Sequence, residues 1–172
     1  MASLLPIIDD ILPMILPTSV SITKKTDIIP LVPPMVPNAD GTPGTHRVRV
    51  YSRDAVVGRL DKICSTVLVL SPNTYSTIRH YGEQDAILYV ALGSGVLLTA
   101  SSSKEKDEDD PERHELGQGD FAAVPAWTEH QVLNESTDQD AHWVIIRSGG
   151  HPVEVHLKGW GRGKAEYPPS RA

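Results

Sequence analysis

The chain has 172 residues, 40% of them hydrophobic, which is enough to bury the core of one compact domain. Its formal net charge of -6 argues against nucleic acid or an anionic membrane as a partner, because most of the surface would repel phosphate. The one cysteine, Cys64, cannot form an internal disulfide, which agrees with a reducing, cytoplasmic location.

The first 45 residues predict an N-terminal arm. Residues 4–16 are apolar, but they lack a basic start and include two aspartates and two prolines, so they favour a short helix over a signal peptide or membrane span. The proline-rich residues 29–37 predict an extended arm; its apolar residues favour docking on the rest of the protein, and a disordered tail is the alternative.

From His46 onward, short apolar segments alternate with turns, a spacing typical of an all-β sandwich or barrel. The expected domains are an arm (1–45), a barrel (46–160) and a C-terminal tail (161–172), with the charged residues 104–112 as a solvated hairpin loop. The predicted strands are residues 47–52, 65–70, 75–79, 87–92, 96–100, 113–116, 121–124, 131–134, 143–147 and 153–157.

A first motif lies in residues 71–95. His80 is followed by the acidic segment Glu83-Gln84-Asp85 and then by the apolar strand 87–92. Gly93-Ser94-Gly95 turns this strand into the next one as a hairpin.

A second motif lies in residues 119–134. Gly119 belongs to a tight turn that leads into the strand 121–124, and Pro125 ends this strand because it cannot donate to a ladder. His130 then shares a face with Thr128 and Val132, and in a small barrel that face is the interior. There, a neutral imidazole can bind a metal or act as an acid or base.

The following strand, in residues 141–147, offers two alternatives. If its even positions face inward, His142 points into the pocket; if its odd positions do, Arg147 becomes a candidate anion clamp. The sequence leaves both open.

Together, the two motifs resemble the cupin family over residues 67–157. The second motif has every anchor of the family signature except a middle glycine, which is Trp127 here. In the first motif Ile78 and Ala86 stand where the family has a histidine and a glutamate, so that only His80 remains. Tyr81 replaces the second histidine of a His-His-Gly-Glu-Gln-Asp run found in small fungal cupins.

The resemblance implies one jelly-roll barrel, with the N-terminal arm or short helix added, and pairing into a homodimer. It also implies a divalent metal (iron, manganese, nickel or zinc) at His80, Asp85 and His130, with Glu83 as the alternative carboxylate. The pocket would be shaped by Tyr89, Trp127, Thr128 and His142. The implied function is a small-molecule enzyme, an oxygenase, decarboxylase or isomerase, acting on an oxygenated metabolite of aromatic or polyketide type.

Two other functions remain open. One is a metal-free isomerase or cyclase in which His80 or His130 moves a proton and a nearby carboxylate orients it. The other is a ligand-binding cupin without chemistry, in which apolar side chains fill the barrel and keep the two histidines apart.

Overall fold

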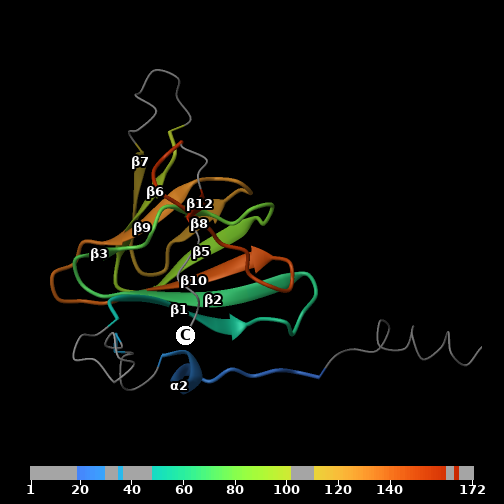
Figure 1. Ribbon diagram of the computed structural model, residues 1–172. Helices are drawn as coiled ribbons and strands as arrows, with labels where there is room; N and C mark the ends of the chain where they lie inside the picture. Colours follow the sequence, from blue (N-terminus) through green and yellow to red (C-terminus); the bar gives the residue numbers. More distant parts are fainter. Residues whose placement is uncertain (1–18, 30–34, 37–47, 102–110, 162–164, 167–172) are drawn as a thin grey trace, which may run out of the picture.

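The computed structural model describes residues 19–29, 35–36, 48–101, 111–161 and 165–166, and the regular secondary structure of these residues is almost entirely β (Figure 1). Every strand pairing is antiparallel. The strands form two sheets that pack face to face (Figure 1). This arrangement confirms the predicted all-β jelly roll.

The first sheet has five strands in the order β1 (Val50–Val56), β2 (Ile63–Leu70), β10 (Ala141–Ser148), β5 (Ala86–Leu92) and β8 (Phe121–Val124). The second has seven strands, with the order β12 (Ala165–Glu166), β11 (Val155–Leu157), β4 (Arg79–His80), β9 (His130–Asn134), β6 (Gly95–Thr99) and β7 (Glu112–Leu116), while β3 (Thr74–Tyr75) pairs with β9. Strands distant in sequence therefore lie side by side in both sheets.

One predicted strand is wrong: residues 75–79 divide into β3 and β4 with an irregular stretch between them. The cause lies at Ser76, whose backbone N–H donates to the carbonyl of Val132 while its hydroxyl oxygen accepts the N–H of the same residue. A side-chain oxygen has taken the place of a backbone carbonyl, so the regular ladder is interrupted.

Little of the predicted N-terminal arm can be compared with the structure. Residues 4–16, most of 29–37 and most of the charged loop 104–112 lie outside the described residues. The described part contains a short helix, α2 (Lys25–Ile28), which lies against β1 (Figure 1). None of the described helical segments has the length and apolar character to cross a lipid bilayer.

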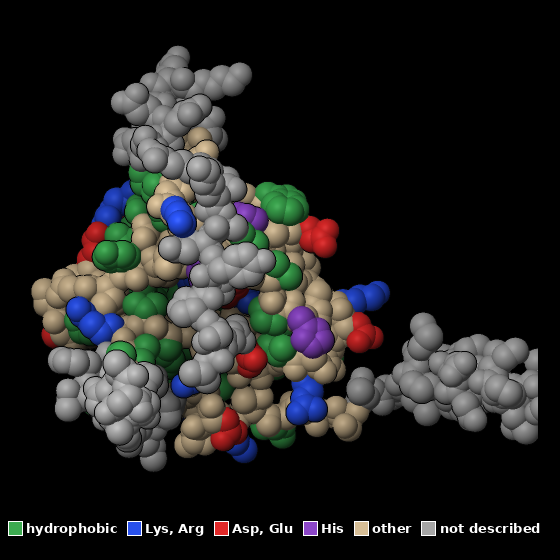
Figure 2. All heavy atoms as spheres, viewed as in Figure 1, with side chains coloured by type: hydrophobic (Ala, Val, Ile, Leu, Met, Phe, Trp, Pro, Cys, Tyr) green, Lys and Arg blue, Asp and Glu red, His purple; other side chains and the backbone are tan. Residues whose placement is uncertain are grey.

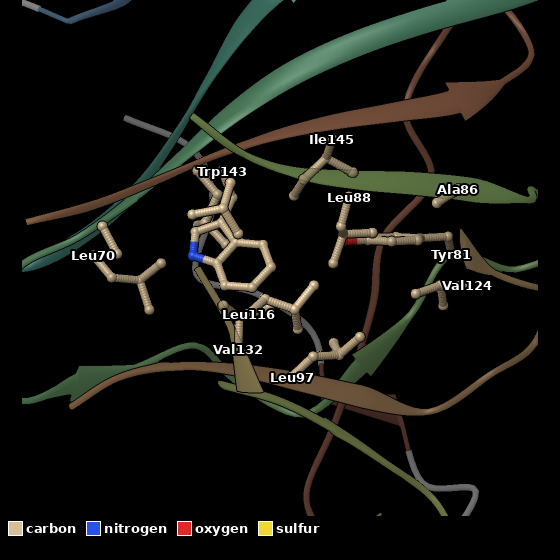
Figure 3. Packing of buried hydrophobic residues seen from close by; sticks show 13 residues of the cluster. Leu70, Tyr81, Ala86, Leu88, Leu97, Leu116, Val124, Val132, Trp143 and Ile145 are labelled. Atoms are coloured by element: carbon tan, nitrogen blue, oxygen red, sulfur yellow. The ribbon is translucent and has the colours of Figure 1, made fainter. Parts of the chain in front are cut away.

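The hydrophobic core fills the space between the two sheets (Figure 3). Trp143 lies at its centre and is 0% exposed. Gly95 makes room for this ring, because a Cβ atom there would lie 2.6 Å from Cζ2 of Trp143 and 2.7 Å from the carbonyl oxygen of Leu133. The cluster consists of Leu68, Leu70, Tyr81, Ala86, Leu88, Val90, Leu97, Leu116, Val124, Val132, Ala141, Trp143 and Ile145.

Asn134, the last anchor of the second motif, has a structural role. Its buried carboxamide donates to the carbonyl oxygens of Leu70 and Gln139 at 3.0 and 2.8 Å. The first of these bonds ties the two sheets together, because Leu70 ends β2 while Asn134 ends β9.

Candidate functional site

Three neighbouring strands of the seven-stranded sheet direct polar side chains toward the space between the sheets. Arg79 on β4 lies opposite His130 on β9 and opposite His156 on β11. Directly opposed residues of an antiparallel pair share a face of the sheet, so these side chains lie on one side. Tyr81, two residues beyond Arg79, is buried on this side and extends into the core (Figure 3).

The facing sheet contributes Arg147, at the end of β10. The odd positions of this strand are buried and the even ones are less so, which means that the odd positions face inward. Arg147 is therefore an interior residue, and it is 1% exposed. His142 instead lies on the outer face, which corrects its predicted place in the pocket.

The two interior arginines share one carboxylate, that of Glu154. Nη2 of Arg147 donates to Oε1 of Glu154 at 2.6 Å, and Nη1 of Arg79 donates to Oε2 at 3.4 Å. Burial by itself would raise the pKa of the Glu154 carboxyl, but the guanidinium charges of Arg79 and Arg147 hold that pKa below its ordinary value. Glu154 is therefore ionised at neutral pH, and the group of three carries one surplus positive charge.

The ring of Tyr81 lies next to the guanidinium of Arg147 and next to the imidazole of His130. The Cζ atom of Arg147 is 4.2 Å from the centroid of the phenol ring, and the centroids of the phenol and imidazole rings are 4.5 Å apart. A cation over an aromatic face is stabilised by the ring quadrupole, so Tyr81 helps to hold Arg147 in the interior. We refer to Arg79, Tyr81, His130, Arg147 and Glu154 together as the Arg79 cluster.

His130 is 0% exposed and neutral. Burial lowers its pKa from 6.5 to about 4, and the positive charges of Arg79 and Arg147 act in the same direction. Nδ1 donates to the carbonyl oxygen of Thr128 at 2.9 Å, because a carbonyl can only accept. The lone pair of a neutral ring is then on Nε2.

Several polar atoms of the Arg79 cluster are buried and have no hydrogen-bond partner among the described residues. They include Nε and Nη2 of Arg79 and Nε and Nη1 of Arg147. They also include the hydroxyl of Tyr81 and Nε2 of His130. Buried polar groups are paired in most native proteins, so this concentration of unpaired polar atoms marks a site with capacity for a ligand.

A surface groove of about 680 Å³ opens next to the cluster, and both Arg79 and Glu154 line it. It lies between β1 on one side and the segment 75–79 with the start of β11 on the other. At its rim, Oγ1 of Thr77 lies 2.6 Å from Nδ1 of His156, whose Nε2 is 3.8 Å from Oε2 of Glu154. The lining residues are Val50, Tyr51, Ser52, Arg53, Asp54, Leu68, Tyr75, Ser76, Thr77, Arg79, Glu154 and His156.

The surplus positive charge belongs to this interior rather than to a basic surface patch. On the face of the molecule shown in Figure 2, acidic and basic side chains alternate, without a large area of one sign. On that face, an anion would therefore be attracted by the positive charge at the floor of the groove and not by a large positively charged surface.

The structure does not bring together the two histidines predicted to share a metal. Because Arg79 faces His130, the next residue, His80, points to the opposite face of the sheet. There Nδ1 of His80 accepts the N–H of Gly82 at 3.0 Å, and its ring lies 5.4 Å from that of Trp127. This corrects the prediction that both imidazoles converge inside the barrel.

The predicted carboxylate ligands also lie elsewhere. Asp85 is exposed and its Oδ1 accepts the N–H of Ala126 at 3.0 Å, while Glu83 is exposed to solvent. In the described part of the chain, no group of three or more His, Cys, Asp or Glu side chains is arranged to hold a metal ion. The guanidinium groups of Arg79 and Arg147 would also repel a cation bound at His130, so a divalent metal does not fit this donor set.

The other predicted pocket residues lie outside the interior. Tyr89 is on the outer face of β5, where its ring is 4.5 Å from that of Phe121. Trp127 is 65% exposed at the turn before β9, and Thr128 contributes only its backbone carbonyl to His130. Trp127 adopts a φ of 63°, a left-handed conformation that explains why the family signature has glycine at this position.

Sequence reasoning missed Thr77, Arg79, Glu154 and His156, and it gave Tyr81 no role. One signal was available: Arg79 ends a predicted strand directly after the apolar residue Ile78, and a charge that is buried in a strand requires a partner. Its partner Glu154 is 75 residues away in sequence, and only the pairing of β4 with β11 brings the two together.

Comparison with known proteins identifies the fold. The sequence profile of the Cupin_2 family, described as a cupin domain, matches residues 66–147. A search of curated proteins gave no match.

Among solved structures, a likeness with a TM-score above 0.5 is to an oxalate oxidase. Oxalate oxidase in complex with the substrate analogue glycolate has a TM-score of 0.53 and 13% identity, over 63% of this chain and 55% of that one. TT1209 from Thermus thermophilus has a TM-score of 0.48 and 18% identity, over 59% and 84%. KdgF from Halomonas sp. has a TM-score of 0.46 and 16% identity, over 59% and 79%. At these identities the likeness concerns the fold and not the activity.

Proposed function

From the premise that this chain carries a single cupin domain, we propose that it binds a small organic anion, an aromatic carboxylate, at the Arg79 cluster and without a metal. One observation carries the proposal: Arg79 and Arg147 are both buried and share the single carboxylate of Glu154.

The charge balance of the cluster favours an anion. Two guanidinium groups and one carboxylate leave one positive charge, since His130 is neutral. Desolvating a charge without a counter-charge is costly, so a ligand carboxylate in the groove would be attracted to this site.

The chemistry of the donors favours a carboxylate among small anions. A guanidinium presents its N–H groups in a planar fork that matches the two oxygens of a carboxylate. Arg79 is the member of the cluster that both lines the groove and has unpaired N–H groups, although these groups, Nε and Nη2, are buried and a side-chain shift would be needed to present them to a ligand. It is therefore the residue through which a ligand in the groove would contact the cluster.

The aromatic part of the ligand is suggested by the groove wall. Tyr75 lines the groove and is 69% exposed, and Tyr51 lines the facing wall. The exposed phenol ring of Tyr75 provides a face on which a planar apolar group can stack. A ligand with a ring and a carboxylate would use both features of the groove.

Calorimetric titration tests this function with three probes, benzoate, acetate and benzyl alcohol, on protein treated with a chelator. We expect benzoate to bind more tightly than acetate, and benzyl alcohol, which lacks the charge, not to bind. Arg79→Met should abolish benzoate binding, whereas Arg79→Lys should weaken it because the charge remains and the fork is lost.

The matched control is Arg113→Met, which removes a surface arginine paired with Glu115 and Glu135 and should leave binding unchanged. Thermal unfolding gives an independent measurement, since a ligand that binds only the native state raises the Tm. Equal Tm with and without benzoate in the unsubstituted protein would overturn the proposal. A stoichiometric metal that is lost in His130→Ala would also overturn it.

A further inference from the structure

We infer that the groove also has a nucleophile, the hydroxyl of Thr77, activated by His156 and Glu154 for acyl transfer from a small ester. The substrate class rests on the proposed anion site, but the chemical step does not. All three residues line the same groove.

The three groups form a row of hydroxyl, imidazole and carboxylate. Oγ1 of Thr77 is 2.6 Å from Nδ1 of His156, a strong hydrogen bond, and Nε2 of the same ring faces Oε2 of Glu154 at 3.8 Å. Because the carboxylate is ionised, it favours the tautomer with its proton on Nε2, and Nδ1 then accepts the hydroxyl proton. A nucleophile, a base and a group that orients the base are the elements of nucleophilic catalysis.

The fold holds the row in place from several directions. His156 is fixed by the pairing of β11 with β4, and the adjacent Leu157 donates its N–H to the carbonyl of Ile78. Glu154 is held by the two buried arginines. Thr77 is exposed, so its oxygen is accessible from the groove.

The step is balanced as follows. Nδ1 of His156 takes the hydroxyl proton while Oγ1 of Thr77 bonds to the ester carbonyl carbon; the bond from that carbon to the leaving oxygen then breaks, and the leaving alcohol takes the proton back. Water next attacks the acyl group on Thr77 and gives a proton to the imidazole; the bond from the acyl carbon to Oγ1 of Thr77 then breaks, and Oγ1 takes that proton back. The net reaction is ester plus water to carboxylic acid plus alcohol, and its product carries the carboxylate that the Arg79 cluster is proposed to bind.

The experiment uses two esters, para-nitrophenyl acetate and the para-nitrophenyl monoester of succinic acid, with release of nitrophenol followed optically. Intact and peptide mass spectrometry after rapid acid quenching should find one acyl group on Thr77. We expect Thr77→Val to slow nitrophenol release by about 100-fold and Thr77→Ser to retain most of the rate.

A second threonine–histidine pair supplies the control. Oγ1 of Thr99 lies 3.0 Å from Nε2 of His114, and both residues line a different groove. Thr99→Val should therefore release nitrophenol at the unsubstituted rate. Circular dichroism and Tm of each variant would show that Thr77→Val is folded.

The outcomes separate the two proposals. Two results would overturn the role of Thr77 as nucleophile and leave the anion site intact. One is that the protein binds benzoate but carries no acyl group on Thr77 after reaction with the esters. The other is that Thr77→Val and the unsubstituted protein release nitrophenol at equal rates. Acylation of Thr77 by both esters without any preference for the succinate ester would support the nucleophile and count against the anion site.

Discussion

Replacement of His130 tests the electrostatics of the interior, because this imidazole is neutral and fully buried. Its pKa is about 4 in the native protein and 6.5 in an unfolded chain. Between these values the unfolded chain binds a proton that the native protein does not. The contribution of neutral His130 to the free energy of unfolding is therefore complete above pH 6.5, the pKa in the unfolded chain. It is lost as the pH falls toward the pKa in the native protein.

These pKa values give a magnitude. On going from about pH 7 to about pH 5, the native protein should lose about 2 kcal/mol of its free energy of unfolding through this group. His130→Gln should lower stability at neutral pH, since the site is fully packed, but its stability should depend less on pH over the same interval by about that amount.

Urea denaturation at several pH values, followed by circular dichroism, measures both effects. His151→Gln removes an exposed imidazole and serves as the control, which should keep the pH dependence of the unsubstituted protein. Equal pH dependence in the unsubstituted protein and His130→Gln would refute the reasoning. Titration of the ring nitrogens by NMR would give the native pKa directly, even if the variant does not fold.

Three further predictions concern stability and can be measured by urea denaturation. Gly95→Ala should lower the free energy of unfolding by about 1 to 3 kcal/mol, because the added Cβ would lie 2.6 Å from the ring of Trp143. The control is Gly117→Ala, whose Cβ would meet only a carboxylate oxygen at 3.6 Å, and it should cost less than about 1 kcal/mol. Similar losses of stability in the two variants would contradict this reasoning. Glu154→Gln should lower the free energy of unfolding by about 3 to 5 kcal/mol, because two buried guanidinium groups lose their counter-charge. The control, Glu115→Gln at the surface, should cost less than about 1 kcal/mol. An equally small loss in Glu154→Gln would show that the cluster is hydrated. Trp127→Gly should stabilise the protein by up to about 1 kcal/mol by removing the strain of a φ of 63°, and a net loss would mean that contact with His80 outweighs the strain.

The sequence predicted the fold well because its evidence is local. Alternating apolar positions and turn residues mark most of the strands, and the apolar stretch that became β5 is plain in the printed sequence. The division between β3 and β4 was missed because it depends on the hydroxyl of Ser76 bonding to a residue 56 positions away.

The site was harder to predict because it depends on register. In β4, a shift of one residue decides whether His80 or Arg79 faces inward, and nothing local to that segment fixes the choice. The same ambiguity in β10 could be stated from the sequence as an alternative between His142 and Arg147, but only the pairing with β2 and β5 resolves it. Resemblance to a family favoured the histidine in the first case, and the structure favours the arginine.

Trp143 and Trp127 lie in very different environments, so their intrinsic fluorescence can report on different parts of the protein. The first indole is sealed at the centre of the core, whereas the second is 65% exposed on a turn. Emission from the sealed ring should shift to longer wavelength only when the whole domain opens, while the other should remain accessible to a soluble quencher throughout. The third tryptophan, Trp160, would contribute emission of its own, so in a Trp160→Phe variant fluorescence can distinguish a rearrangement near β9 from loss of the native structure without any added label.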